Sequence, residues 1–138
     1  MLKTIGKKRL PRKPSKLLRF ALESLKLREK SPKYRINMSK WFIRTPKFCM
    51  VCFAGATLSR VYRMKNNLLD ELTYNTPPYR VAMALNYIHK NMVRSGLEWL
   101  NVPASSLTDV YIPPYEKGRR NFKKAIKTLA DKLEANGY

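Results

Sequence analysis

The stretch FCMVCFAGATL, residues 48–58, contains no charged side chain and constrains the fold more than any other part of the chain. A segment that is apolar on every side must be buried on every side, so it belongs at the centre of the protein. Thr45 followed by Pro46 is a typical helix start and predicts a central helix that reaches about Met64. Gly55, flanked by two alanines, should let a neighbouring helix approach closely.

Three further amphipathic stretches predict helices around this centre. An apolar stripe indicates a helix over residues 16–30, Thr76 before two prolines starts another that Gly96 can close, and a third spans residues 118–135. We therefore expect an all-α protein with one compact domain of about four helices over residues 15–138. The connections, expected to be extended, turn-like or Pro-rich, are residues 31–47 and 101–118.

The charge of the chain is unevenly distributed. Its formal net charge is +20, from 29 Lys and Arg against 9 Asp and Glu. Residues 1–47 contain 16 basic and 2 acidic side chains, residues 48–116 contain 6 and 5, and residues 117–138 contain 7 and 2. Such an excess causes strong self-repulsion unless a polyanion is bound. The composition therefore predicts a nearly neutral packing unit with basic flanks and a nucleic-acid partner, either DNA or RNA.

The N-terminal 14 residues are expected to form a flexible basic arm, because Pro11 and Pro14 obstruct regular structure and no acid is present. The arm could also be a solvated tail without a partner, or a nuclear localisation patch. We expect phosphate contacts that are independent of base sequence, made by the arm, the outer face of the first helix and the basic face of the last. The predicted contact residues are Lys7, Lys8, Arg9, Arg12, Lys13, Lys16, Arg19, Arg120, Lys123, Lys124 and Lys127.

The two cysteines, Cys49 and Cys52, could indicate a metal site, a redox pair or packing. A structural zinc site needs four ligands, and His89 is the only further ligand of the usual nitrogen or sulfur type, so the set is one short. A redox pair needs an exposed first cysteine at a helix N-terminus, whereas these neighbours are apolar. We therefore expect two reduced cysteines packed on one face of the central helix, no metal and no cofactor.

An enzymatic function is not expected, because the chain has no Gly-rich phosphate loop, no nucleophile elbow and no cluster of carboxylates for metal-dependent hydrolysis. No apolar run is long enough for a transmembrane helix, and no secretory signal follows the basic N-terminus. The sequence therefore predicts a non-enzymatic protein of the cytoplasm with no membrane partner. It does not predict the oligomeric state.

The segments SPKYRINMSKWF and CMVCFAGA resemble small uncharacterised proteins of tailed bacteriophages, which share a Pro-x-Tyr…Met-x-x-Trp…Cys-x-Val-Cys-x-Ala-Gly-Ala pattern. Phe42 stands where the pattern leads us to expect a histidine. The resemblance implies a location in the cytoplasm of an infected bacterial cell and brings no known activity. It also leaves open an alternative function, an inhibitor that docks on an acidic host or anti-phage defence protein. The matching positions are Pro32, Tyr34, Ile36, Asn37, Met38, Trp41, Cys49, Val51, Cys52, Ala54, Gly55 and Ala56.

Overall fold

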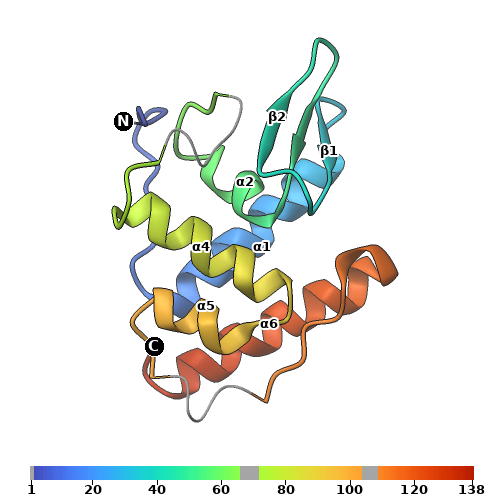
Figure 1. Cartoon of the computed structure of the whole chain (residues 1–138). Coiled ribbons are helices and arrows are strands. Elements are labelled where there is room, and N and C mark those ends of the chain that lie inside the picture. Colours follow the sequence, from blue (N-terminus) through green and yellow to red (C-terminus); the bar gives the residue numbers. More distant parts are fainter. Residues whose placement is uncertain (1, 66–71, 104–108) are drawn as a thin grey trace.

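The computed structural model describes residues 2–65, 72–103 and 109–138, which combine helices with a small mixed sheet (Figure 1). The prediction of an all-α protein is therefore wrong, and the fold is α+β. The elements are α1 (Pro14–Lys30), β1 (Tyr34–Ile36), β2 (Phe42–Arg44), β3 (Cys49–Val51), α2 (Phe53–Leu58), α4 (Pro77–His89), α5 (Val93–Trp99), the 3-10 turn η2 (Tyr115–Lys117) and α6 (Arg119–Ala135).

The sheet replaces the first part of the predicted central helix. Strand β3 lies in the middle, antiparallel to β2 and parallel to β1. Thr45 does not cap a helix, because its hydroxyl donates to the Phe48 carbonyl (2.6 Å) and accepts from the Phe48 amide (3.1 Å), which closes the β2–β3 turn. A short apolar run is typical of a buried strand as well as of a buried helix, so periodicity alone could not separate them.

Helix α2 is all that remains of the predicted central helix, and all six of its residues are buried. The sulfur of Cys52 caps it by accepting the Gly55 amide at 3.5 Å. A Cβ on Gly55 would lie 1.8 Å from the Trp41 carbonyl oxygen. Gly55 therefore permits a close approach, as predicted, but to the backbone that precedes β2 rather than to another helix.

Helices α1 and α6 are the long amphipathic helices that the sequence predicts, and they pack against each other below α2 (Figure 1). Phe122 of α6 meets the rings of Phe53 and Tyr115 edge-on, with both centroid distances at 5.5 Å. The predicted end at Gly96 is wrong. Helix α4 ends at His89, and Gly96 lies inside α5, where a Cβ would be 2.5 Å from Ile88.

The N-terminal segment runs over the surface of the domain instead of extending from it as a flexible arm. Thr4 forms an antiparallel bridge with Tyr62, the Ile5 amide donates to the Val61 carbonyl (2.8 Å), and the Arg63 amide donates to the Lys3 carbonyl (2.8 Å). Two leucines of this segment, Leu2 and Leu10, pack against the core. The segment follows the surface in spite of its charge because its leucines bury apolar surface and its backbone groups form hydrogen bonds with the domain. Over its described residues, the structure contains no helix long and apolar enough to cross a membrane.

Candidate nucleic-acid interface

Two adjoining hollows share Tyr62 and together collect basic side chains from distant parts of the chain. The larger is a groove of about 580 Å³ between the N-terminal segment, the start of α4 and the end of α5, and the smaller, about 540 Å³, lies between the N-terminal segment, the sheet and the chain after α2. No acidic residue is among the described residues that line either hollow. We call their seven cations the arm face: Lys8, Arg9, Arg12 and Arg80 line the groove, and Arg44, Arg63 and Lys65 line the smaller hollow.

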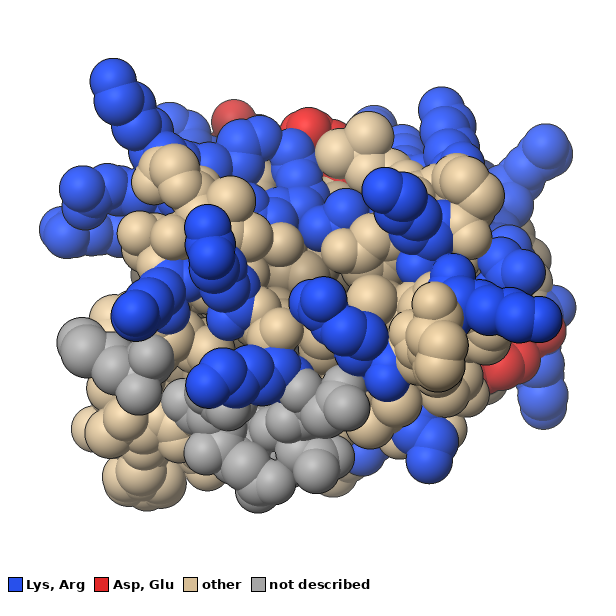
Figure 2. All heavy atoms as spheres, turned by 90° about the horizontal axis from the view of Figure 1, so that it is seen from above, with Lys and Arg blue, Asp and Glu red and all other residues tan. Residues whose placement is uncertain are grey.

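Figure 2 shows the side of the molecule where the N-terminal segment and the tip of the β2–β3 hairpin lie, seen from above Figure 1. Lys and Arg side chains spread over this side, and the few acidic side chains visible lie near its margins. Among the described residues of this side, phosphates would therefore meet many more basic than acidic side chains.

The backbone bonds of the N-terminal segment hold its cations in place. The bridge at Thr4 is followed by a turn at Gly6, whose φ of 66° suits glycine, so the chain then passes along one wall of the groove. Lys8 lies 5.7 Å from the centroid of the Phe20 ring. Arg9 is close enough to Tyr62 to oppose the rise in the pKa of that hydroxyl that burial causes. The segment therefore presents its charges from a defined position.

Arg80 on the first turn of α4 is the most firmly positioned cation of the groove. Its guanidinium donates to the Asn75 amide oxygen at 2.7 Å and to the Asn101 amide oxygen at 3.0 Å. It also lies over the indole of Trp99, 5.5 Å from the ring centroid. All three partners are neutral, so they orient the Arg80 guanidinium without pairing it with a carboxylate. Such a guanidinium is suited to bind an anion.

The smaller hollow is organised around the end of α2. Arg28 donates to the Ser59 hydroxyl at 3.0 Å and stacks on Tyr34 with its guanidinium 4.1 Å from the ring centroid. Arg44, at the end of β2, reaches the Met64 carbonyl at 3.5 Å. This hydrogen bond connects the β2–β3 hairpin to the chain after α2 beside the smaller hollow.

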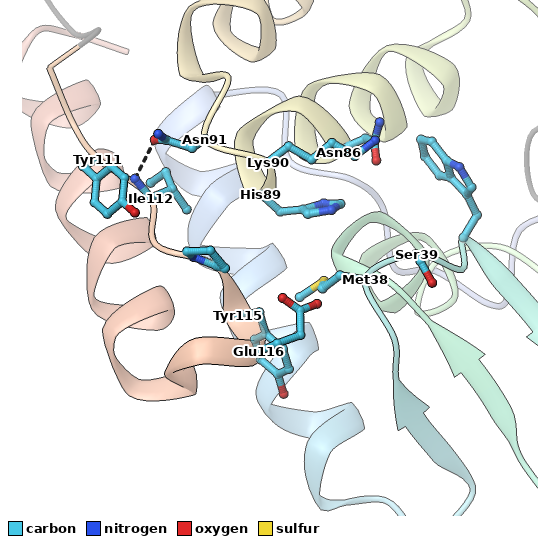
Figure 3. A pocket seen from close by; sticks show the side chains of 12 residues that line it. Met38, Ser39, Asn86, His89, Lys90, Asn91, Tyr111, Ile112, Tyr115 and Glu116 are labelled. Carbon is cyan, nitrogen blue, oxygen red and sulfur yellow. Dashed lines mark hydrogen bonds between the residues drawn. The ribbon is translucent and has the colours of Figure 1, made fainter.

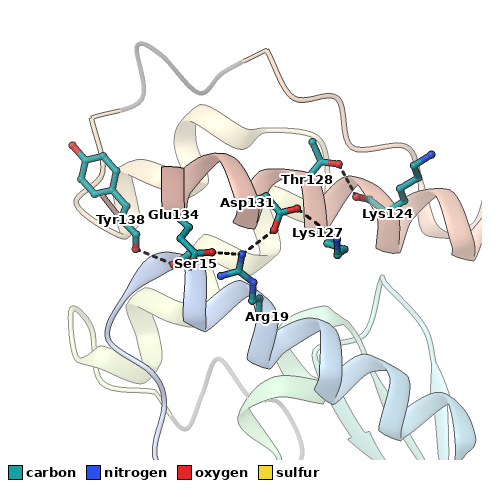
Figure 4. Close-up of polar contacts among 8 residues, drawn as sticks. All are labelled: Ser15, Arg19, Lys124, Lys127, Thr128, Asp131, Glu134 and Tyr138. Carbon is teal, nitrogen blue, oxygen red and sulfur yellow. Dashed lines mark hydrogen bonds and ion pairs between the residues drawn. The ribbon is translucent and has the colours of Figure 1, made fainter. Parts of the chain in front are cut away.

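Other cations that the sequence predicts as phosphate ligands are neutralised between α1 and α6, as Figure 4 shows. Arg19 of α1 donates to Asp131 (2.8 Å) and Glu134 (2.6 Å), and Lys127 lies 3.6 Å from Asp131. The hydrogen bond from Arg19 holds the pKa of Asp131 below its ordinary value. We call this region the seam, which consists of Arg19, Lys123 and Lys127 with Glu29, Asp131 and Glu134.

The seam also contains a more buried ion pair. Lys123 donates to Glu29 at 2.7 Å, and the other oxygen of the same carboxylate accepts the hydroxyl of Tyr115. The Lys123 and Glu29 side chains are 24% and 11% exposed. Burial, followed by the bond to Glu29, raises the pKa of Tyr115 far above its ordinary value, so this hydroxyl stays a donor.

The structure therefore separates the eleven predicted contact residues into groups. Three of them, Arg19, Lys123 and Lys127, belong to the seam and have acidic partners. Helix α6 lies along the side of the molecule opposite the N-terminus in Figure 1, so Arg120 and Lys124 are not brought together with the arm. Three predicted residues belong to the arm face, namely Lys8, Arg9 and Arg12. The remaining three, Lys7, Lys13 and Lys16, are exposed next to it and form no ion pair within the described residues.

The sequence did not reveal four members of the arm face. Arg44 lies near the end of the basic residues 1–47, whereas Arg63, Lys65 and Arg80 lie in the nearly neutral middle of the chain. They become neighbours only through the hairpin, the bridge at Thr4 and the packing of α4 against α5. No pattern in the sequence would have identified them as one surface.

His89 and the two cysteines do not form one site. His89 lies in a separate pocket of about 690 Å³ with Met38, Trp41 and Glu116, and neither cysteine lines it (Figure 3). Within the described residues, no three or more His, Cys, Asp and Glu side chains gather where they could hold a metal ion. The prediction that both cysteines pack on one helix face is wrong, because Cys49 lies in β3 and Cys52 precedes α2.

The electrostatics of these residues favour structural roles. Burial raises the pKa of the Cys52 thiol to about 11, so Cys52 is protonated at neutral pH and unreactive. Burial and then Lys90 lower the pKa of His89 to about 4, against smaller opposing effects of the Leu85 carbonyl and Glu116. Its Nδ1 forms no hydrogen bond within the described residues. His89 is therefore a neutral imidazole at physiological pH.

Comparison with known proteins found no matching protein family, no similar curated protein and no similar solved structure.

Proposed function

We propose that this protein is a non-enzymatic nucleic-acid-binding protein that contacts phosphates through the arm face without reading base sequence. One observation supports this proposal above all: seven cations from separate segments line two adjoining hollows, and no acid is among the described lining residues. The positive charges of such a surface repel one another and so destabilise the folded protein. A bound polyanion reduces this repulsion. The resemblance to phage proteins suggests that binding takes place in an infected bacterial cell.

The mechanism is the exchange of small cations for protein cations along a phosphate backbone. Each phosphate neutralised by Lys or Arg releases condensed counterions, so affinity falls steeply as the salt concentration rises. Arg80 and the hydrogen-bonded N-terminal segment are held in position before binding, which lowers the entropy lost on association.

The experiment compares two double charge reversals with the parent chain. Arg9→Glu with Arg12→Glu alters the arm face, and Arg120→Glu with Lys124→Glu makes the same change in net charge on an exposed face of α6. Labelled oligonucleotides are titrated by fluorescence anisotropy at several salt concentrations. We expect the arm-face variant to lose at least tenfold in affinity at about 50 mM salt, with a salt slope shallower by up to about 0.9 per lost phosphate contact on duplex DNA.

The α6 variant should lose much less affinity. Absence of binding by the parent chain at low salt would overturn the proposal and favour an acidic protein partner, such as a host or defence protein. Equal losses for the two variants would show that total charge matters and that the arm face has no special role.

A further inference from the structure

A row of aromatic side chains lies beside the arm face and outside the hydrophobic core. The Tyr74 and Tyr79 rings are 5.2 Å apart and the Tyr79 and Trp99 rings 5.7 Å apart between centroids, in tilted and edge-on arrangements. Tyr74 is 72% exposed. None of the three belongs to the core cluster or to the partly buried residues packed on it. Burial in the core therefore does not explain why three large aromatic residues meet here.

The aromatic row is directly connected to the phosphate-binding cations. Trp99 lines the groove together with Arg80, whose guanidinium stacks on the indole, and the cations of the N-terminal segment form the facing wall. Asn75, one residue after Tyr74, orients Arg80 with its amide oxygen. A chain passing along the groove would thus have charged groups on one side and aromatic rings close to the other.

From this arrangement we infer that the groove binds single-stranded nucleic acid, with phosphates on the arm-face cations and bases stacked on Tyr74, Tyr79 and Trp99. The inference rests on the proposed function and narrows its ligand class. Bases in a duplex are stacked on one another and have no free faces, whereas those of a single strand can stack on protein rings. Stacking of this kind tolerates any base, which agrees with contacts that do not depend on sequence.

The test uses the full chain with a single-stranded oligothymidylate, an oligouridylate and a DNA duplex, which are compared at each of several salt concentrations. We expect both single strands to bind at least tenfold more tightly than the duplex. Tyr74→Ala should weaken single-strand binding about tenfold, within the range measured for loss of one stacked base, and leave duplex affinity and the salt slopes unchanged. The difference between the two single strands shows whether DNA or RNA is preferred.

Tyr111→Ala is the matched control, because Tyr111 is 64% exposed and does not line the groove. It should bind all three oligonucleotides as the parent does. A second readout uses Trp41→Phe, which leaves Trp99 as the only tryptophan, whose fluorescence should be quenched by single strands and not by the duplex. Equal affinity for single strands and duplex, together with no effect of Tyr74→Ala, would overturn this inference while the proposed function stands. Failure of all three oligonucleotides to bind would overturn both.

Discussion

The arm face and the seam are both rich in Lys and Arg, yet their cations have opposite surroundings. In the seam, Arg19 lies between two carboxylates and Lys123 shares Glu29 with a tyrosine hydroxyl. In the arm face, the partners seen for Arg80 are amide oxygens and an aromatic ring. The acids that pair with the first set lie four residues away on α6 or on the other of the two long helices, whereas no acid is among the described residues that line the two hollows.

This contrast shows that a formal charge of +20 does not identify the charges that are available to a ligand. A paired cation must give up its acid before it can bind a phosphate, and its gain is correspondingly smaller. An unpaired cation loses only water and counterions. The seam should therefore contribute to stability and the arm face to binding, and each of the following changes tests that division.

The largest expected effect is that of pH on the free energy of unfolding. A change of pH also separates stability from binding, because it removes no cation. The folded pKa of His89, about 4, lies below the unfolded value of about 6.5, so its contribution is present above pH 6.5 and is lost as the pH falls toward 4. We expect the free energy of unfolding to fall by about 3 kcal/mol over this range, measured by urea denaturation. In His89→Gln the fall should be much smaller.

Binding provides the comparison for this pH effect. Lys and Arg stay protonated throughout the window, so the affinity of the parent chain for an oligonucleotide should be the same at pH 7 and pH 5 while it is folded. A loss of affinity that follows the titration of His89 would contradict the division between stability and binding.

The next effect concerns the buried ion pair of the seam. Glu29→Gln removes the charge that compensates the half-buried Lys123 ammonium, and we expect the free energy of unfolding to fall by about 2 kcal/mol in urea denaturation. Lys123→Met added to Glu29→Gln should recover part of this loss, because no uncompensated charge then remains. Oligonucleotide affinity should stay within about twofold of the parent, and a large drop would show that the seam takes part in binding.

A smaller effect should follow from adding an acid to the arm face. Thr4 is exposed and lines the groove, so Thr4→Glu places a carboxylate among its cations without removing any of them. We expect affinity at about 50 mM salt to fall roughly fivefold, because one phosphate contact would face an opposing charge. Thr128→Glu, the same substitution on the exposed face of α6, serves as the control. Equal losses in the two variants, measured by anisotropy, would contradict a localised site.

The smallest effect is expected from releasing the seam cations. Asp131→Asn with Glu134→Gln leaves Arg19 and Lys127 without their acids and raises the net charge by two, yet neither of these cations lines the groove or the smaller hollow. Oligonucleotide affinity should therefore rise by less than about twofold. A tenfold rise would mean that unpaired charge anywhere on the protein is sufficient for binding.

Part of the fold could be predicted from the sequence. The long helices α1 and α6 were found within one or two residues, because each has an apolar stripe of several turns opposite a polar face. The hairpin was missed because its strands have only three residues each, and their register with β1 depends on contacts that local sequence does not reveal. Thr45 and Pro46 suit a hairpin turn as well as a helix start, and the hydrogen bonds of Thr45 decide between them.

The residues of the candidate site were likewise predicted only in part. The cations of the N-terminal segment were predicted because they form a dense cluster in the sequence. Arg80 and the aromatic row were not recognised, because isolated Asn, Tyr and Trp residues do not by themselves indicate a binding site. Asn75 and Trp99 contact the same guanidinium, and Tyr79 contacts Trp99, only in the folded protein.

The sequence by itself determined the total charge, the two long amphipathic helices and the burial of the apolar stretch around Cys52, since composition and periodicity are local properties. Only the tertiary structure decided which cations are neutralised. An ion pair requires atoms within about 4 Å of each other, and Arg19 and Asp131 are 112 residues apart in the chain. The packing of α1 on α6 brings those two charges together, and the packing of α4 on α5 places Arg80 beside an aromatic ring and two amide oxygens.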